Sequence, residues 1–174
     1  MITSIIDFIN YIGVKNMQDN LAIAHSFGCL HRNAKAYIVD ACRAWNLTYS
    51  EYVLLLRLYE EEGRSQEELA AELDLDKAAI TRSIQLLEQK NFLRRETDAK
   101  DKRRKHLFVT EYARTQQNEL QDILGTWVEY LSEGISKSER DIVVQALTKL
   151  AVRSGEADFI GNVRKRIRHE VKRS

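Results

Sequence analysis

Apolar and polar positions in the middle of the chain predict two short helices joined by a tight link. In "SQEELAAEL", Leu69 and Leu73 lie four residues apart on one helical face, and Ser65 and Glu68 have the spacing of a capping box. The link "DLD" follows, and Asp76 is expected to cap the second helix. Two short helices connected in this way form a helix-turn-helix pattern.

The second of these helices has two contrasting faces. Ile80, Ile84 and Leu87 fall together on a helical wheel and are expected to point inward. The opposite face contains small, amide and guanidinium side chains, with Thr81 at its flank: Ala78, Arg82, Gln85 and Gln89. Arginine can bond guanine, and glutamine adenine, through two atoms each, so this face is predicted to contact DNA. The alternative is an ordinary solvated face, although such faces usually mix Glu with Lys.

A basic β-hairpin is predicted directly after the second helix. Asn91 is expected to end that helix in a left-handed conformation. "FLRRET" leads through the turn-like "DAKD" into "KRRKHLFVT", where Leu107 and Val109 alternate with His106 and Phe108 as in a strand. A hairpin in this place is a wing, whose basic tip would reach phosphates or a second groove of DNA.

The rest of the chain is predicted to be helical. It contains no proline, and apolar stripes recur at helical spacing. Helices are expected at 1–16, 18–45, 47–63 (capped by Thr48 or Ser50 and ended by Gly63), 111–132, 136–154 and 156–174. The predicted fold class is mainly α with a small β-hairpin wing. The expected domains are N-terminal dimerisation helices over 1–46, a winged helix-turn-helix DNA-binding domain over 47–112 and C-terminal dimerisation helices over 113–174.

Charge is segregated along a chain whose formal net charge is +1. Residues 77–106 contain ten Lys or Arg against four Asp or Glu, and residues 164–174 contain six against one. Positive charge attracts a polyanion only where it is concentrated, so the basic hairpin is expected to lie against a nucleic-acid duplex.

These motifs together resemble the MarR family of bacterial transcription regulators. The stretch "SQEELAAELDLDKAAITRSIQLLEQKNFLRRETDAKDKRRKHLFVT" is similar to family members in order and spacing. The matching pieces are Leu69-Ala70, Asp76-Lys77, Thr81-Arg82, Leu87-Glu88-Gln89-Lys90, Asp98…Asp101…Arg103 and Val109-Thr110. The chain departs from the usual pattern, without loss of a basic group, at Asn91, Ala99, Val109 and Ala113.

The resemblance implies a homodimer whose two winged domains meet successive major grooves of a palindromic operator. The surplus apolar stripes near both chain ends independently favour a twofold dimer. The residues expected to contact DNA are Lys77, Ala78, Thr81, Arg82, Gln85, Arg95, Lys102, Arg103 and Arg104. Asp101 is expected to orient the Arg103 guanidinium across the turn.

Members of this family often bind small aromatic anions between the dimer helices and the winged domain. The candidate effector-binding residues are Arg43, Trp45, Tyr49, Tyr52 and Trp127. Plain core packing is the alternative for each of them.

No catalytic set, phosphate-binding loop or cofactor motif is found, so the chain is not expected to be an enzyme. His25, Cys29 and His31 are poorly spaced for zinc, so no metal is predicted. Cys29 or Cys42 would react only if nearby cations such as Arg32 or Arg43 stabilised a thiolate. The lack of a signal peptide or an apolar membrane span predicts a cytoplasmic protein.

The predicted function is sequence-specific DNA binding by a dimeric regulator, a repressor that a small-molecule or stress signal releases. The alternative is a winged-helix module that binds proteins and not DNA. Such a module would more often carry apolar residues where this chain has Arg82 and Gln85.

Overall fold

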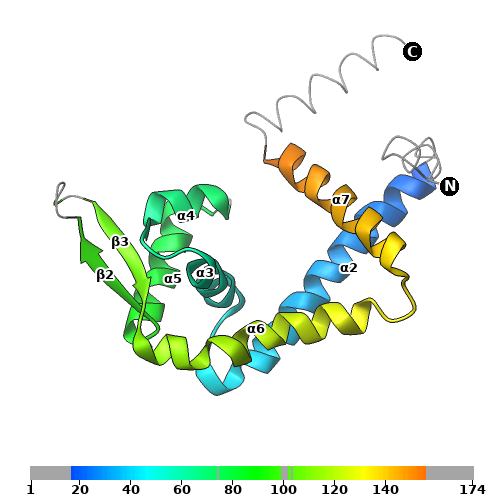
Figure 1. The fold of residues 1–174 in the computed structure, drawn as a ribbon. Helices are drawn as coiled ribbons and strands as arrows, with labels where there is room; N and C mark the ends of the chain where they lie inside the picture. The colour runs from blue at the N-terminus through cyan, green and yellow to red at the C-terminus, as the bar shows by residue number, and fades with distance from the viewer. Residues whose placement is uncertain (1–16, 74, 99–101, 103, 156–174) are drawn as a thin grey trace, which may run out of the picture. The chain divides into compact units, whose positions relative to one another are not determined.

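A computed structural model describes residues 17–73, 75–98, 102 and 104–155 (Figure 1). The predicted helix over 1–16 and the predicted C-terminal helix over 156–174 lie outside these residues. The elements are α2 (Met17–Ala41), the 3-10 helix η1 (Cys42–Trp45), α3 (Tyr49–Glu60), β1 (Arg64–Ser65), α4 (Gln66–Glu72), α5 (Lys77–Gln89), β2 (Leu93–Thr97), β3 (Lys105–Val109), α6 (Glu111–Leu131) and α7 (Lys137–Ser154). The prediction of a mainly helical chain with one β-hairpin is confirmed.

Side-chain caps begin the helices where the sequence predicts them. Thr48, and not Ser50, caps α3 in a capping box with Glu51. Asp76 caps α5 by accepting bonds from the backbone N–H groups of Ala78 and Ala79, both at 2.8 Å. Two more capping boxes begin α4 and α7, formed by Ser65 with Glu68 and by Ser136 with Glu139. Each cap satisfies backbone donors that a helix leaves unpaired at its first turn.

The sheet has three strands, of which the sequence predicted two. Its order is β1-β3-β2, and both pairings are antiparallel. β1 pairs Arg64 with Leu107 and Ser65 with His106. Gly63 does not end α3 as expected, because the helix stops at Glu60. Gly63 adopts a φ of 79° and donates its N–H to the Leu107 carbonyl at 2.8 Å, which starts β1.

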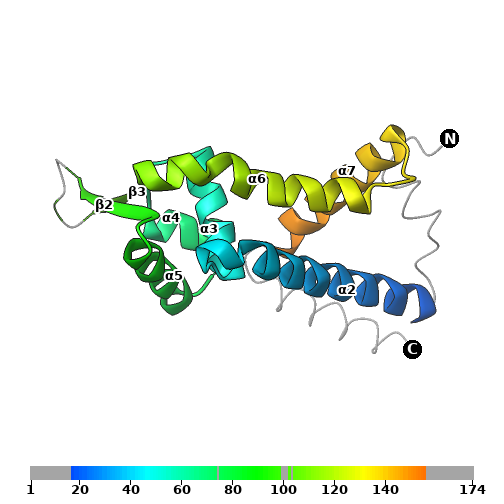
Figure 2. The same ribbon diagram turned by 90° about the horizontal axis from the view of Figure 1, so that it is seen from below.

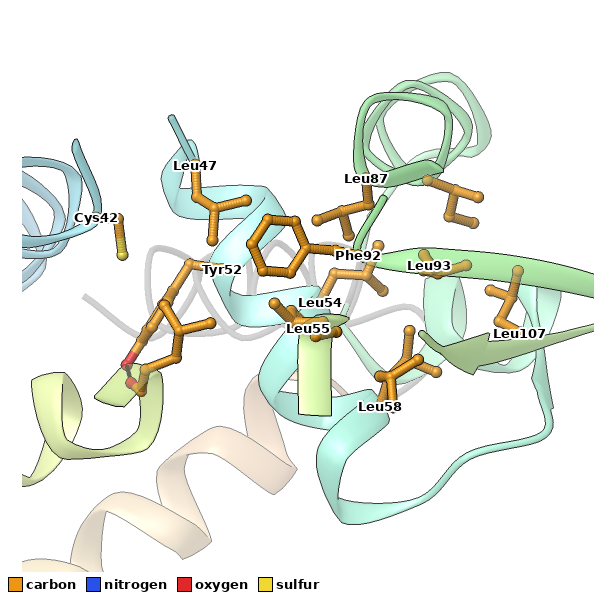
Figure 3. Packing of buried hydrophobic residues seen from close by; sticks show 14 of the residues in the cluster. Cys42, Leu47, Tyr52, Leu54, Leu55, Leu58, Leu87, Phe92, Leu93 and Leu107 are labelled. Atoms are coloured by element: carbon orange, nitrogen blue, oxygen red, sulfur yellow. Dashed lines mark hydrogen bonds between the residues drawn. The ribbon is translucent and has the colours of Figure 1, made fainter. Parts of the chain in front are cut away.

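Residues 21–131 form one compact unit with a single apolar core. Side chains from α3, α5 and the sheet fill this core, as Figure 3 shows for Leu54, Leu87 and Leu107. Two tyrosines of α3 bond the helix α6 to this core through their hydroxyl groups. The Tyr52 hydroxyl donates to the Leu120 carbonyl at 2.8 Å, and the Tyr59 hydroxyl donates to the Ala113 carbonyl at 2.6 Å. The core therefore takes in residues on both sides of the predicted 47–112 domain, whose boundaries stay a prediction.

Apolar side chains outside that core remain exposed on α6 and α7. The apolar stripe of α6 is buried at Leu120 and Ile123 but exposed at Leu124 and Leu131. On α7, Ala146 is buried, while the large exposed hydrophobic residues are Val143, Val144, Leu147, Leu150 and Val152. An exposed apolar surface of this extent usually marks an interaction site.

Candidate nucleic-acid interface

A polar contact joins the start of α4 to the second turn of α5. The Gln66 amide donates to the Thr81 hydroxyl at 2.7 Å, and that hydroxyl donates to the Lys77 carbonyl at 2.6 Å. Thr81 is half-buried, and its hydroxyl proton is used inside the motif.

The outer face of α5 is exposed, as the wheel predicts. Ile80, Ile84 and Leu87 are fully buried beneath it. The residues exposed to solvent on α5 are Lys77, Ala78, Arg82, Gln85 and Gln89. A face with one guanidinium and two amides in its middle can donate and accept hydrogen bonds at base edges.

The hairpin formed by β2 and β3 extends away from α3, α4 and α5 (Figures 1 and 2). Lys102 and Arg104, near its tip, are exposed. Arg94 lies over the ring of Phe108, with its guanidinium carbon 5.0 Å from the ring centroid. Arg103 and Asp101 lie outside the described residues, so the predicted orienting contact between them stays a prediction.

Arg95 occupies a different place from the other wing cations. Its guanidinium lies 2.9 Å from the Glu88 carboxylate of α5, and the pair joins β2 to that helix. Arg95 also lines a cleft of about 360 Å³, whose other lining residues are Ser65, Gln66, Glu67, Glu68, Arg104, Lys105 and Leu107. Its position therefore favours a role in holding the wing against α5, and its DNA contact stays a prediction.

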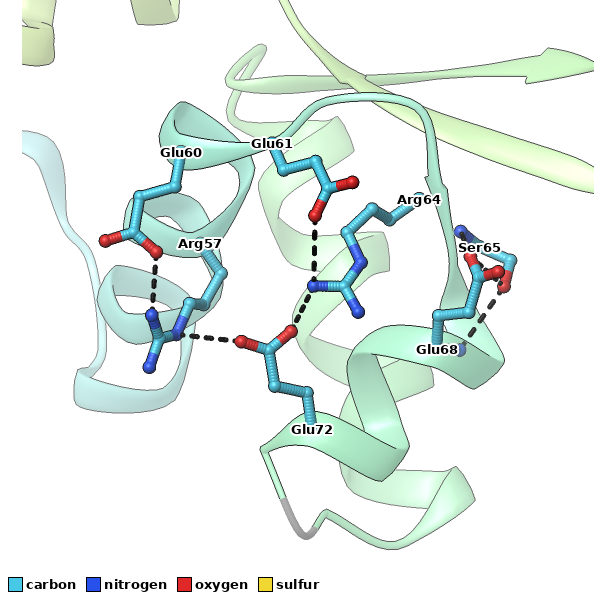
Figure 4. A network of polar contacts seen from close by, with 7 residues as sticks. All are labelled: Arg57, Glu60, Glu61, Arg64, Ser65, Glu68 and Glu72. Atoms are coloured by element: carbon cyan, nitrogen blue, oxygen red, sulfur yellow. Dashed lines mark hydrogen bonds and ion pairs between the residues drawn. The ribbon is translucent and has the colours of Figure 1, made fainter. Parts of the chain in front are cut away.

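An ion-pair network fixes the corner between α3, β1 and α4 (Figure 4). The Glu72 carboxylate accepts from Arg64 and lies 3.3 Å from Arg57 Nε. Arg57 also pairs with Glu60 at 2.7 Å, and Arg64 with Glu61 at 3.6 Å. These arginines are paired within the corner, whereas Lys102 and Arg104 of the wing are exposed.

The His106 ring links the turn end of the hairpin to Gly63, the residue before β1. Its Nδ1 lies 2.6 Å from the Gly63 carbonyl oxygen, and its Nε2 lies 3.0 Å from the Asp98 carboxylate. A carbonyl and a carboxylate both accept, so only the doubly protonated imidazole donates to both. The bond to Asp98, followed by the bond to Gly63, raises the pKa of His106 above its usual 6.5.

This arrangement predicts a pH-dependent wing. A raised pKa in the folded state means that the contribution of His106 to stability is complete below about pH 6.5 and is lost as pH rises through the raised pKa. Thermal unfolding of the native chain and of His106→Gln, compared from about pH 5 to about pH 8, should show the native chain losing more stability with rising pH. Parallel curves for the two proteins would contradict the role of the imidazolium. Asp98→Asn, which keeps a bond but removes the charge, should also flatten the difference.

The predicted effector residues do not all come together. A groove of about 460 Å³ at the corner between α2 and α3 is lined by Lys35, Val39, Arg43, Asn46, Leu47, Thr48, Tyr49 and Ser50. Arg43 lies in it and pairs with Asp40 at 2.9 Å. Tyr52 is fully buried, and Trp45 donates its indole N–H to the Gln116 side chain at 2.7 Å, so both are part of the packing. Neither these two residues nor Trp127 lines the groove.

The two thiols differ in their surroundings. Cys42 is fully buried, and burial raises its pKa to about 11, which is the opposite of what a reactive thiolate needs. Cys29 is half-buried. Within the described part of the chain, no group of three or more His, Cys, Asp or Glu side chains is placed to hold a metal ion. No helix among the described residues is long and apolar enough to span a bilayer.

Comparison with known proteins connects this interface to a family. Residues 47–105 match the model of the MarR family. The chain is 37% identical over 93 residues to the HTH-type transcriptional regulator TtmR of Methylorubrum extorquens (strain PA1), a match that covers 53% of this chain and 44% of TtmR. Residues 47–105 thus carry a MarR-family domain. The chain spans less than half the length of TtmR. It is also 25% identical over 133 residues to the HTH-type transcriptional regulator BilQ of Clostridioides difficile (strain CD3), a match that covers 76% of this chain and 89% of BilQ.

Solved structures show that the MarR fold extends over most of the chain. The MarR transcriptional regulator from Methanosarcina mazei Go1 matches with a TM-score of 0.72 and 26% identity, over 76% of this chain and 95% of that one. A MarR-family regulator from Listeria monocytogenes, solved in complex with a 26mer DNA, matches with a TM-score of 0.75 and 22% identity, over 82% and 93% of the two chains. The predicted winged helix-turn-helix fold is therefore confirmed. TtmR and BilQ are named as HTH-type transcriptional regulators, in agreement with the prediction that this chain is a regulator and not an enzyme.

Several polar contacts that join the elements of the candidate interface were not predicted from the sequence. They involve Gln66, Glu51, Lys90 and Glu88. The two-residue strand β1 was not predicted either. Gln66 had a usable signal in the sequence, because it directly follows the predicted N-cap Ser65. Glu51 and Lys90 are separated by 39 positions, so no local spacing could have paired them.

Proposed function

We propose that this protein is a sequence-specific DNA-binding transcription regulator that acts as a homodimeric repressor on a palindromic operator. The observation that carries the proposal is the exposed face of α5 around Arg82 and Gln85, held above a fully buried apolar face and flanked by the basic wing. A helix of this kind fits the major groove, and the wing cations fit the adjacent phosphates. The match of residues 47–105 to the MarR family supports the same role.

The experiment that tests the proposal is selection of binding sites from a pool of random duplexes by the full chain. Enrichment of one motif with twofold symmetry supports both operator recognition and dimeric binding. A protein that enriches no motif and binds duplexes only weakly would favour the alternative of a protein-interaction module. A cytoplasmic location stays a prediction from the sequence.

The wing is expected to supply sequence-independent affinity. Lys102 and Arg104 are exposed near its tip, where they can neutralise phosphates. Each phosphate contact adds about 0.9 to the slope of log affinity against log salt on duplex DNA. Arg104→Ala should therefore weaken operator and random DNA alike and flatten that slope by about one unit, as measured by titration across a salt series. Lys137→Ala, which removes an exposed cation from α7 and not from the wing, provides the control and should leave the slope unchanged. A loss confined to the operator would contradict the proposed role of the wing.

The dimer is proposed from the exposed apolar surfaces of α6 and α7. Leu124 and Leu131 of α6 and Val144 and Leu150 of α7 are each more than a third exposed, at 38, 39, 57 and 52%. Removing such side chains from water stabilises an assembly by about 25 cal/mol for each Å² of apolar surface. A second copy of the chain is the partner that twofold symmetry and a palindromic operator require.

The groove between α2 and α3 is proposed to receive a small anionic effector. Lys35 and Arg43 supply positive charge, and Tyr49 supplies an aromatic edge. This site keeps two of the predicted effector residues, Arg43 and Tyr49. It adds Lys35, which the sequence did not single out.

A further inference from the structure

A buried ion pair connects the end of the recognition helix α5 to the beginning of α3. The Lys90 ammonium lies 2.8 and 2.9 Å from the two carboxylate oxygens of Glu51, and it also donates to the Asn46 carbonyl. The Glu51 side chain is fully buried, and that of Lys90 is 19% exposed. Glu51 accepts in addition from the Thr48 backbone N–H at 2.6 Å. Every donor of the ammonium therefore has an acceptor, all on the segment that starts α3.

The pair joins two left-handed turns. Asn46, which ends η1, has a φ of 53°, and Asn91, which follows Lys90, has a φ of 60°. The Asn91 carbonyl is in turn held by the Thr110 hydroxyl at 2.6 Å, at the start of α6. The end of α5 is thus fixed from two sides, by α3 through Lys90 and by α6 through Asn91.

Apolar packing alone does not give α5 this constraint. The buried face of α5 consists of Ile80, Ile84 and Leu87, and apolar contact is non-directional, so it tolerates small rotations of a helix. A charge-assisted hydrogen bond is directional and short. A buried ion pair also gives little net stability, because removing two charges from water costs about as much as their attraction returns. Orientation is the effect for which this pair is suited.

We propose that Glu51 and Lys90 are positioning residues, which set the rotation of the recognition helix so that Arg82 and Gln85 meet base edges. The inference rests on the proposed function for its consequence at DNA. The pair touches no base or phosphate in this scheme. It acts through the backbone of α5, whose last turn it holds.

The test separates orientation from stability by comparing single variants with a double variant. Lys90→Met leaves a buried carboxylate without its partner and should destabilise the fold. Glu51→Gln combined with Lys90→Met removes both charges, leaves an acceptor for the Thr48 N–H of the capping box, and should recover most of the lost stability in thermal unfolding. A purely structural pair would then be fully replaced by the neutral one.

In the folded double variant, two measurements decide the matter. Residual dipolar couplings of the α5 amides, recorded without DNA, should no longer fit the orientation that α5 has relative to α3 in the native chain. Affinity for the selected operator should fall roughly tenfold, the effect of misaligning one base contact. Affinity for random DNA and the salt slope should stay unchanged, because the phosphate contacts are intact. Lys90→Arg, which keeps the charge, should retain most of the operator preference.

A matched control is Glu60→Gln, which removes one partner of an exposed ion pair on α3 and should alter neither measurement. A double variant that keeps both the native orientation of α5 and the full operator preference would overturn the proposal. If the native chain itself shows no operator preference, the proposed function fails, and the dipolar couplings still decide whether the pair positions α5.

Discussion

Replacing Val143 and Leu147 on α7 with Glu is expected to convert the protein to a monomer and to lower its operator affinity by about a hundredfold or more, since a dimer engages two half-sites at once. The two side chains lie one helical turn apart and are 44 and 42% exposed, so the charges would enter the proposed contact and not the core of residues 21–131. Sedimentation velocity gives the assembly state, and titration with the selected operator gives the affinity.

The control for this variant uses the polar side of the same helix. Gln145 and Lys149 are also four residues apart and exposed, and replacing both with Glu adds the same number of carboxylates. This control should remain a dimer. If the Val143 and Leu147 variant also sediments as a dimer with native affinity, α7 is not part of the interface.

Arg82→Ala is expected to cost roughly 1–3 kcal/mol at the selected operator and little on random DNA. The reason is its place in the middle of the exposed face of α5, on the side opposite to Ile84. Arginine there can donate two parallel bonds to one guanine, a contact that random sequence rarely offers. Competition binding with operator and random duplexes at fixed salt measures the difference.

Lys102→Ala is the comparison for Arg82→Ala, because it removes a cation from the wing and not from the recognition helix. It should weaken both DNAs equally. Equal losses on the two DNAs for Arg82→Ala would instead make Arg82 a phosphate contact and move base recognition to other residues of α5.

Local spacing was enough to predict much of the interface. The caps at Ser65 and Asp76, the left-handed Asn91 and the two faces of α5 each depend on residues within one or two helical turns, and the structure has them all. The strands β2 and β3 were also found, because Leu107 and Val109 alternate with more exposed neighbours.

Features that depend on distant residues were not predictable in this way. The strand β1 has two residues and exists only because β3 pairs with it, so it leaves no period in the sequence. The alternation of the strand gave no sign of the contacts of His106, whose ring meets Gly63 and Asp98 from two other segments. The same holds for the predicted effector residues. Aromatic side chains near an arginine in the sequence suggested one site, but in the structure Trp45 bonds Gln116 and Tyr52 bonds Leu120.

The sparse burial of α7 has a consequence for the lifetime of the protein in a cell. Of the 18 residues in this helix, Ala146 is the one that the structure buries, and the helix contains Lys137, Arg140, Lys149 and Arg153 as cleavage sites for trypsin-like proteases. An unpaired chain would open there easily, because few contacts oppose local unfolding. Pairing with a second copy would cover the helix and protect it. Degradation would then remove surplus single chains first, and the amount of regulator that persists would depend on how fast newly made chains find one another.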